Sequence, residues 1–190
     1  MIDAERRAMH DARRRGGVRI ARPNTARLSL TVVEAAATMS TTPSCYFEDV
    51  TLGERFHFGP YHVSREELLE FNGRWDPLPI HMNDAAAQAR GLKGMTASGQ
   101  YTLCIKQKML HGAPWTDAVI GALGFDELRF PHPVYPGDDI SLTIECLELR
   151  ASNSKPDRGI VKFAFRLTNQ DGVAVLNYLD TVMFARRPRG

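Results

Sequence analysis

The chain is 190 residues long, which suits one domain of ordinary size and leaves too little for two large ones. Its composition, 43% hydrophobic and 24% charged, is that of a globular protein rather than of a disordered or fibrous one. The formal net charge of +2 is unevenly spread: residues 1–44 contain eight arginines and four acids, and residues 45–190 contain 16 basic and 18 acidic residues. The excess of positive charge belongs to the N-terminal segment, so it does not indicate a nucleic-acid-binding fold.

Residues 1–44 show no sustained hydrophobic period, and we expect a disordered basic extension there, ahead of one domain at residues 45–190. The apolar stretch 28–39 follows arginines in the manner of a signal peptide. However, Glu34 interrupts it and the leader before it contains acids, so a targeting role is the less favoured alternative. The interpretation that we favour takes Met39 as the true start, with the first 38 residues as an extension.

The three cysteines, Cys45, Cys104 and Cys146, are widely spaced and form no CxxC pair. They therefore support neither a disulfide framework nor a zinc site, and they fit a reducing, cytoplasmic setting. No apolar run approaches the roughly 18–20 residues that are needed to span a bilayer. We accordingly expect no membrane partner.

The predicted elements begin with a strand over residues 56–63, followed by three helices, at residues 65–72, 83–90 and 98–110. Ser64 precedes two glutamates, as an N-cap residue does. The helix over 98–110 is the longest of the three, and glycine and proline follow it. Asp76–His81 contains two prolines that restrict the backbone, which predicts a non-helical turn.

Four strands are expected after the helices, at residues 119–130, 139–150, 159–169 and 173–185. Alternating apolar residues mark the second and third of these strands, and Gln170–Gly172 is a hairpin signal. One strand, a set of helices and four strands in meander order predict an α+β domain with an antiparallel sheet and helices on one face. A curved five-stranded sheet wrapped around a long central helix is the hotdog arrangement.

Asp76 and His81 stand five residues apart on the proline-rich turn. A carboxylate can act as a base and an imidazole titrates near neutrality, so together they can hold a water molecule and move its protons. Prolines would reduce the entropy cost of keeping both groups aimed. An aspartate and a histidine at this spacing are nevertheless more often a turn residue and a packed side chain. The spacing alone is therefore weak evidence for a catalytic pair.

A second candidate feature is Thr96–Gly99, which precedes and begins the long helix. A helix N-terminus presents unpaired N–H groups and a partial positive charge, and Gly99 would let a ligand oxygen approach them closely. Such a site could polarise a thioester carbonyl as it becomes enolate-like. Ordinary capping by Ser98 is the simpler explanation of this stretch when it is taken alone.

Together the two features resemble a known family. The stretch FNGRWDPLPIHMNDAAA, followed by GLKGMTASGQYT, is similar to the D-x-N/Q-P-hydrophobic-H and A-S-G pattern of the MaoC-like acyl dehydratases, which include (R)-specific enoyl-CoA hydratases. The C-terminal half resembles the family in its PVYPGD turn, SKPDRG loop and NQDG hairpin. The resemblance covers about residues 45–187 and leaves out the basic extension.

The resemblance implies a hotdog fold and a hydratase or dehydratase that acts on acyl-CoA thioesters. Asp76 and His81 would be the catalytic dyad, the backbone N–H of Gly99 would bind the thioester oxygen, and Ser98 would shape that site. No metal and no cofactor besides the coenzyme A of the substrate would be needed. A hotdog unit of this family would also form at least a homodimer, with no nucleic-acid partner.

One position departs from the family pattern, because Leu78 stands where the pattern has asparagine or glutamine. An amide there could orient the dyad or the substrate, and leucine cannot. Two alternatives therefore stay open: a non-catalytic acyl-CoA-binding or regulatory protein, and a hotdog thioesterase. Thioesterases of this fold that use a carboxylate on the central helix are disfavoured, because Gly99–Leu110 contains no acid.

Overall fold

The computed structural model describes residues 43–188, which lie within one compact unit, Ser40–Gly190. Apart from Pro43 and Ser44, the predicted extension of residues 1–44 lies outside the described residues, and so does Met39. Among the residues that are described, no helix is long and apolar enough to cross a membrane.

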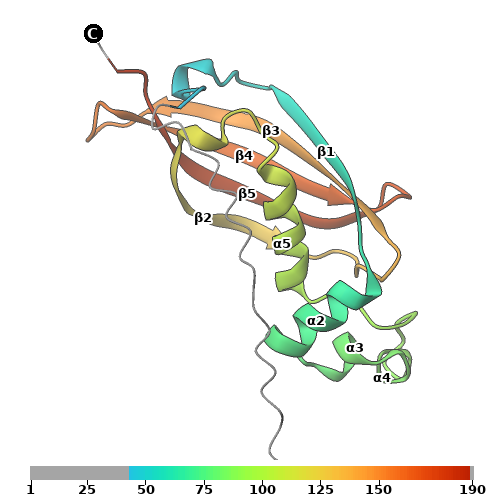
Figure 1. Ribbon diagram of the computed structural model, residues 1–190. Coiled ribbons are helices and arrows are strands. Elements are labelled where there is room, and N and C mark those ends of the chain that lie inside the picture. Colours follow the sequence, from blue (N-terminus) through green and yellow to red (C-terminus); the bar gives the residue numbers. More distant parts are fainter. Residues whose placement is uncertain (1–42, 189–190) are drawn as a thin grey trace, which may run out of the picture. The chain divides into compact units, whose positions relative to one another are not determined.

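Five strands form one antiparallel sheet, as the alternating sequence predicts (Figure 1). They are β1 (Arg55–His62), β2 (Val119–Arg129), β3 (Asp139–Ala151), β4 (Arg158–Thr168) and β5 (Ala174–Ala185). Alternation places one side-chain row of each inner strand on a single face, and Ile140, Leu142 and Ile144 of β3 are completely buried there.

The order of the strands across the sheet is β1-β3-β4-β5-β2, which corrects the predicted meander. Only β3, β4 and β5 follow one another as neighbours, and β2 pairs with β5 at the far edge. The connection from β2 to β3 therefore crosses from one edge of the sheet to the strand beside the other edge. Hairpin signals identify neighbouring strands, but a crossing connection leaves no local signal.

The helices are α2 (Arg65–Trp75), α3 (Pro79–Met82), α4 (Asp84–Gln88) and α5 (Gly99–Leu110), with short 3-10 turns η1 (Phe47–Asp49) and η2 (Thr116–Ala118). The expectation that all of Asp76–His81 is non-helical is wrong, because α3 begins within it. Pro79 occupies the first turn of α3, where the missing N–H of proline breaks no helical hydrogen bond.

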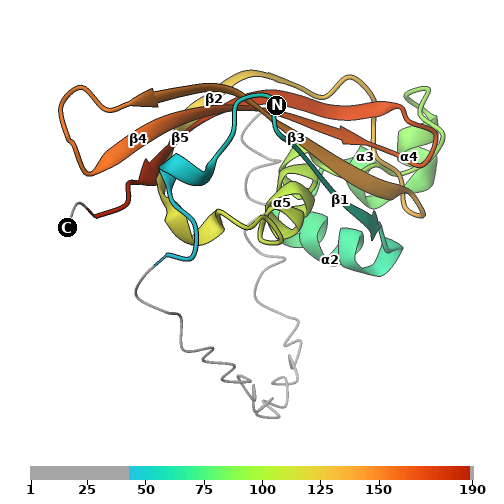
Figure 2. The same ribbon diagram turned by 90° about the horizontal axis from the view of Figure 1, so that it is seen from above.

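The central helix α5 packs on one face of the curved sheet, as Figure 2 shows from above. Tyr101, Ile105 and Met109 recur at a spacing of four residues and are buried in the core. The helix begins at Gly99 because Ser98 adopts an extended backbone and its Oγ accepts a hydrogen bond from Tyr101 N at 3.2 Å. Both predicted residues at the helix start are therefore where the sequence places them.

The edge strand β2 is irregular and exposed. Its pairing with β5 shifts register at three places, and most of its residues are solvent-exposed. The exposed side chains include apolar ones, namely Val119, Ile120, Leu123 and Phe125. An unprotected edge that carries apolar side chains is a surface on which another strand can pair.

The two ends of the described domain are tied together beside η1. Arg186 Nε lies 2.7 Å from Glu48 Oε1, and Arg187 forms an ion pair of 2.7 Å with Asp49. The backbone N–H of Arg187 also donates to Glu48. The polypeptide therefore enters and leaves this domain at neighbouring points (Figure 1).

Candidate active site

Asp76 and His81 lie close to each other, Asp76 at the end of α2 and His81 within the short helix α3. Asp76 is the C-cap residue of α2, and its Oδ2 lies 3.8 Å from His81 Nε2. This distance is within ion-pair range but is too long for a direct hydrogen bond. The His81 side chain is only 11% exposed and that of Asp76 is 30% exposed, so the pair is open to a ligand mainly from the aspartate side.

The opposite edge of the His81 ring contacts Thr96. His81 Nδ1 lies 2.9 Å from the Thr96 carbonyl oxygen and 3.1 Å from Thr96 Oγ1. A carbonyl oxygen can only accept, so the first contact is a hydrogen bond when Nδ1 carries the hydrogen. In that tautomer Nε2 has a free lone pair on the side of Asp76.

Thr96 joins the two predicted features of the sequence. It stands three residues before Gly99, and its N–H donates to the carbonyl oxygen of Ile80 at 3.1 Å. The segment Asp76–His81 therefore runs beside the segment that leads into α5 (Figure 1). Sequence reasoning identified the acid, the imidazole and the helix start, but it did not identify Thr96 as the contact between them.

Asn72 is a second residue of the site that sequence reasoning missed. It is completely buried, and its Nδ2 donates to the carbonyl oxygens of His81 at 2.9 Å and Thr96 at 3.4 Å. The signal that could have found it is a polar residue four positions after Leu68, on the buried face of α2.

The first turn of α5 is tightly packed. Ser98 is completely buried and its hydroxyl caps the helix, so this side chain already has a structural task. Gly99 lies against Phe130, because a Cβ at position 99 would be 2.9 Å from Phe130 Cζ. As the first residue of the helix, Gly99 has an N–H for which the helix provides no acceptor.

The side chain of Leu78 cannot perform the role of the amide that the family pattern has at this position. Its side chain is 52% exposed, and only its backbone takes part in the turn. Its N–H donates to Asp76 O and its carbonyl oxygen accepts from His81 N, both at 2.8 Å. The backbone of the turn is therefore intact, and position 78 presents an exposed apolar side chain in place of an amide.

A different buried polar cluster lies further along α5. Lys106 is 3% exposed, and its Nζ is 5.3–5.7 Å from three aromatic ring centres, those of Phe125, Phe165 and Tyr178. Burial lowers the pKa of Lys106. Asp180 is 4% exposed, and burial raises the pKa of its carboxyl to about 6 although the nearby Lys106 opposes this shift.

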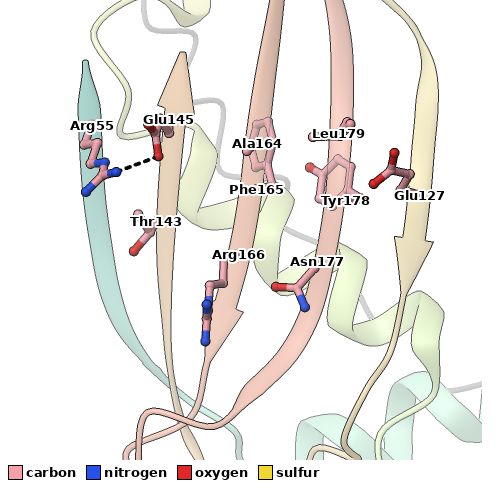
Figure 3. Close-up of a pocket in the computed structure, with 10 residues that line it drawn as sticks. All are labelled: Arg55, Glu127, Thr143, Glu145, Ala164, Phe165, Arg166, Asn177, Tyr178 and Leu179. Atoms are coloured by element: carbon pink, nitrogen blue, oxygen red, sulfur yellow. Dashed lines mark ion pairs between the residues drawn. The ribbon is translucent and has the colours of Figure 1, made fainter. Parts of the chain in front are cut away.

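A pocket of about 420 Å³ lies on the sheet face that is turned away from the core (Figure 3). Thr143 pairs with Arg166 and Glu145 pairs with Ala164 on this face, and Arg55 forms a 3.0 Å ion pair with Glu145. None of the dyad or helix-start residues lines the pocket, so it is separate from the candidate site. Within residues 43–188, no group of three or more His, Cys, Asp or Glu side chains could hold a metal ion.

Comparison with known proteins places this chain in a family. The model of the MaoC like domain matches residues 47–162. The mesaconyl-CoA hydratase of Cereibacter sphaeroides is 30% identical over 154 residues, which are 78% of this chain and 43% of the hydratase. This chain therefore spans less than half of that relative.

Solved structures show the same fold. A MaoC-like dehydratase from Rhodospirillum rubrum has a TM-score of 0.71 and 31% identity, over 76% of this chain and 99% of that one. A conserved hypothetical protein of Mycobacterium tuberculosis with a double hotdog fold has a TM-score of 0.63 and 22% identity. That match covers 77% of this chain and 46% of the double hotdog, so the described domain corresponds to a single hotdog unit.

Proposed function

Because this chain belongs to the MaoC-like dehydratase family, we propose that it adds water to a 2-enoyl-CoA thioester, or removes water in the reverse direction. The observation that carries the proposal is the 3.8 Å separation of Asp76 Oδ2 and His81 Nε2, next to the segment that begins α5. The similarity to a mesaconyl-CoA hydratase supports the same class of reaction.

In the proposed reaction, Asp76 and His81 hold the water between them. As the water oxygen bonds to the β carbon of the enoyl group, the dyad accepts a proton from the water. The dyad then delivers a proton to the α carbon, so the pair ends in its starting protonation state. Because a coupled pair shares its protons, the acid and base roles belong to the pair.

The thioester oxygen gains negative charge as the double bond is consumed. We assign the backbone N–H of Gly99 to this oxygen, where the partial positive charge of the α5 N-terminus favours an anion. Ser98 shapes this site through its cap. The thioester already acidifies the α position, so the proposal needs neither a metal nor a further cofactor.

The proposed assembly is a homodimer in the cytoplasm. The exposed apolar edge of β2 would pair with the same edge of a second copy, which would remove the unpaired β2 edge from both sheets. A relative with a double hotdog fold, of which this chain covers 46%, supports the pairing of two such units. Neither nucleic acid nor a membrane has a part in the proposal.

A second function has one observation in its favour. Leu78 places an exposed apolar side chain where the family pattern has an amide, which would suit a protein that binds acyl-CoA without turning it over. The two functions differ in a single measurable property, which is turnover. Thioester hydrolysis would need Asp76 as its carboxylate, because α5 carries none.

The deciding experiment incubates the protein with crotonyl-CoA and longer trans-2-enoyl-CoA thioesters, and follows the loss of enoyl absorbance. The proposal expects turnover in the wild type and its loss in Asp76→Asn. Glu70→Gln is the matched control, because Glu70 is an exposed acid on the helix that leads to the dyad. Tight acyl-CoA binding without turnover at any chain length would instead support the binding protein, and release of free thiol would support the thioesterase.

A further inference from the structure

Position 78 carries no amide side chain, but a buried amide, that of Asn72, lies elsewhere in the site. We propose that Asn72 is a positioning residue, which fixes the segment Asp76–His81 against the segment before α5 and thereby selects the Nδ1–H tautomer of His81. This inference deepens the proposed hydratase function and rests on it for its catalytic consequence. Its structural part concerns the ligand-free protein and stands on the contacts of Asn72 alone.

Asn72 forms hydrogen bonds with backbone groups of both Asp76 and His81. Its carbonyl oxygen accepts a hydrogen bond from the N–H of Asp76 at 2.9 Å. Its Nδ2 donates to the carbonyl oxygen of His81, also at 2.9 Å. The first is the backbone bond that ends α2, and any residue at position 72 could accept it; only the side-chain bond to His81 is specific to asparagine.

The same amide reaches the segment before α5. Nδ2 of Asn72 lies 3.4 Å from the Thr96 carbonyl oxygen, which also accepts from His81 Nδ1 at 2.9 Å. The amide nitrogen thus has an acceptor for each of its two hydrogens, whereas Oδ1 is buried with no partner among the described residues. The fold uses the donor half of this side chain, and a hydrocarbon of the same size could not replace it.

The tautomer of His81 depends on whether its Nδ1 forms a hydrogen bond with the carbonyl oxygen or with the hydroxyl of Thr96. If Nδ1 carries the hydrogen, it donates to the carbonyl oxygen. If Nδ1 is bare, the hydroxyl of Thr96, at 3.1 Å, can donate to it. The second arrangement would put the hydrogen on Nε2 and remove the lone pair that faces Asp76. By holding the Thr96 carbonyl and the His81 backbone together, Asn72 favours the first arrangement.

The experiment compares Asn72→Leu and Asn72→Asp with the wild type, and uses Glu70→Gln on the same helix as the matched control. The first readout is the nitrogen NMR spectrum of the histidine rings in the ligand-free protein, with His81 identified by its loss in His81→Gln. We expect one Nδ1–H form in the wild type and in Glu70→Gln, and a mixture of both tautomers in Asn72→Leu. Near-ultraviolet circular dichroism checks that each variant is folded.

The second readout is enoyl-CoA hydration. Loss of a contact that orients a reacting side chain typically costs about 10–100-fold at metal sites, and we expect a fall in kcat of this order in Asn72→Leu with KM changed by less than about threefold. Asn72→Asp gives a more specific signal. Its carboxylate would face two carbonyl oxygens at neutral pH, whereas its protonated form can donate to one of them. Its activity relative to wild type should rise as the pH falls, whereas the same ratio for Asn72→Leu should stay flat.

An unchanged His81 spectrum together with kcat within twofold of wild type in folded Asn72→Leu would overturn the inference. If Asn72→Leu does not fold, Asn72→Asp becomes the test. An activity relative to wild type that does not vary with pH would then overturn the inference. If the wild type does not hydrate any enoyl-CoA, the proposed function fails, but the NMR comparison still supports or overturns the role of Asn72. The two failures are therefore distinguishable.

Discussion

The ring of Phe130 lies directly against Gly99, so closely that a Cβ at position 99 would stand 2.9 Å from Phe130 Cζ. Gly99→Ala should therefore displace the ring and lower the free energy of unfolding by about 1 kcal/mol, at the low end of overpacking costs because Phe130 is 45% exposed and can partly move aside. Phe130→Leu removes the ring and should relieve most of this cost in the double variant. Urea unfolding of both single variants and the double variant gives the coupling energy. Effects that add within about 0.5 kcal/mol would contradict the contact.

The dyad should behave as one unit. Removal of a positioned general acid or base typically costs about 10²–10⁴-fold in rate, and we expect Asp76→Asn and His81→Gln each to lower kcat within this range. The double variant should be no slower than the slower single variant, because either change already disables proton transfer. Steady-state kinetics with one enoyl-CoA measure this. Losses that multiply would show that the two residues act independently.

Asp180 should make stability depend on pH. Its pKa is about 6 in the folded protein, against 3.8 as the ordinary value, so the native state keeps a proton that the unfolded chain releases between these limits. The stabilisation is fully present below pH ~4 and is lost as the pH rises through 6, by about 3 kcal/mol in total. Asp180→Asn should remove this part of the pH dependence. Urea unfolding of both proteins from pH 4 to pH 7 measures the difference. If the free energy of unfolding of Asp180→Asn varies with pH as steeply as that of the wild type, the prediction is wrong.

The outer edge of β2 should be required for assembly. Leu123 is 55% exposed there, and Leu123→Lys would put a charge in the proposed strand pairing. Light scattering should detect a dimer in the wild type and a monomer in this variant. Leu147→Lys is the matched control, because Leu147 is 43% exposed on the interior strand β3. A variant at position 123 that remains dimeric would place the interface elsewhere.

The sequence predicts most of the fold because its signals are local. Ser98 caps α5, and alternating apolar residues mark β3 and β4, so these elements can be identified from short windows. Pro79 shows the limit of a local rule. Proline disfavours a helix interior but suits a first turn, and only the observed start of α3 shows which case applies.

The site is harder to predict, because its contacts join distant residues. Asp76 and His81 are only five residues apart, so their spacing already brings them near each other. The role of Asn72 depends on carbonyl groups nine and 24 residues away, and the packing of Phe130 on Gly99 depends on how β2 ends beside α5. Such contacts follow from the assembled sheet and helices, and no local pattern encodes them.

The paired ends of the domain have a consequence for how this unit can be rearranged. Glu48 and Asp49 bind Arg186 and Arg187, so a short linker could join the two ends without crossing the sheet. A circular permutant opened at the exposed β4–β5 turn near Gly172 should keep the fold. The same proximity would let two such units be fused in tandem, a simple genetic route from a single hotdog to a double one.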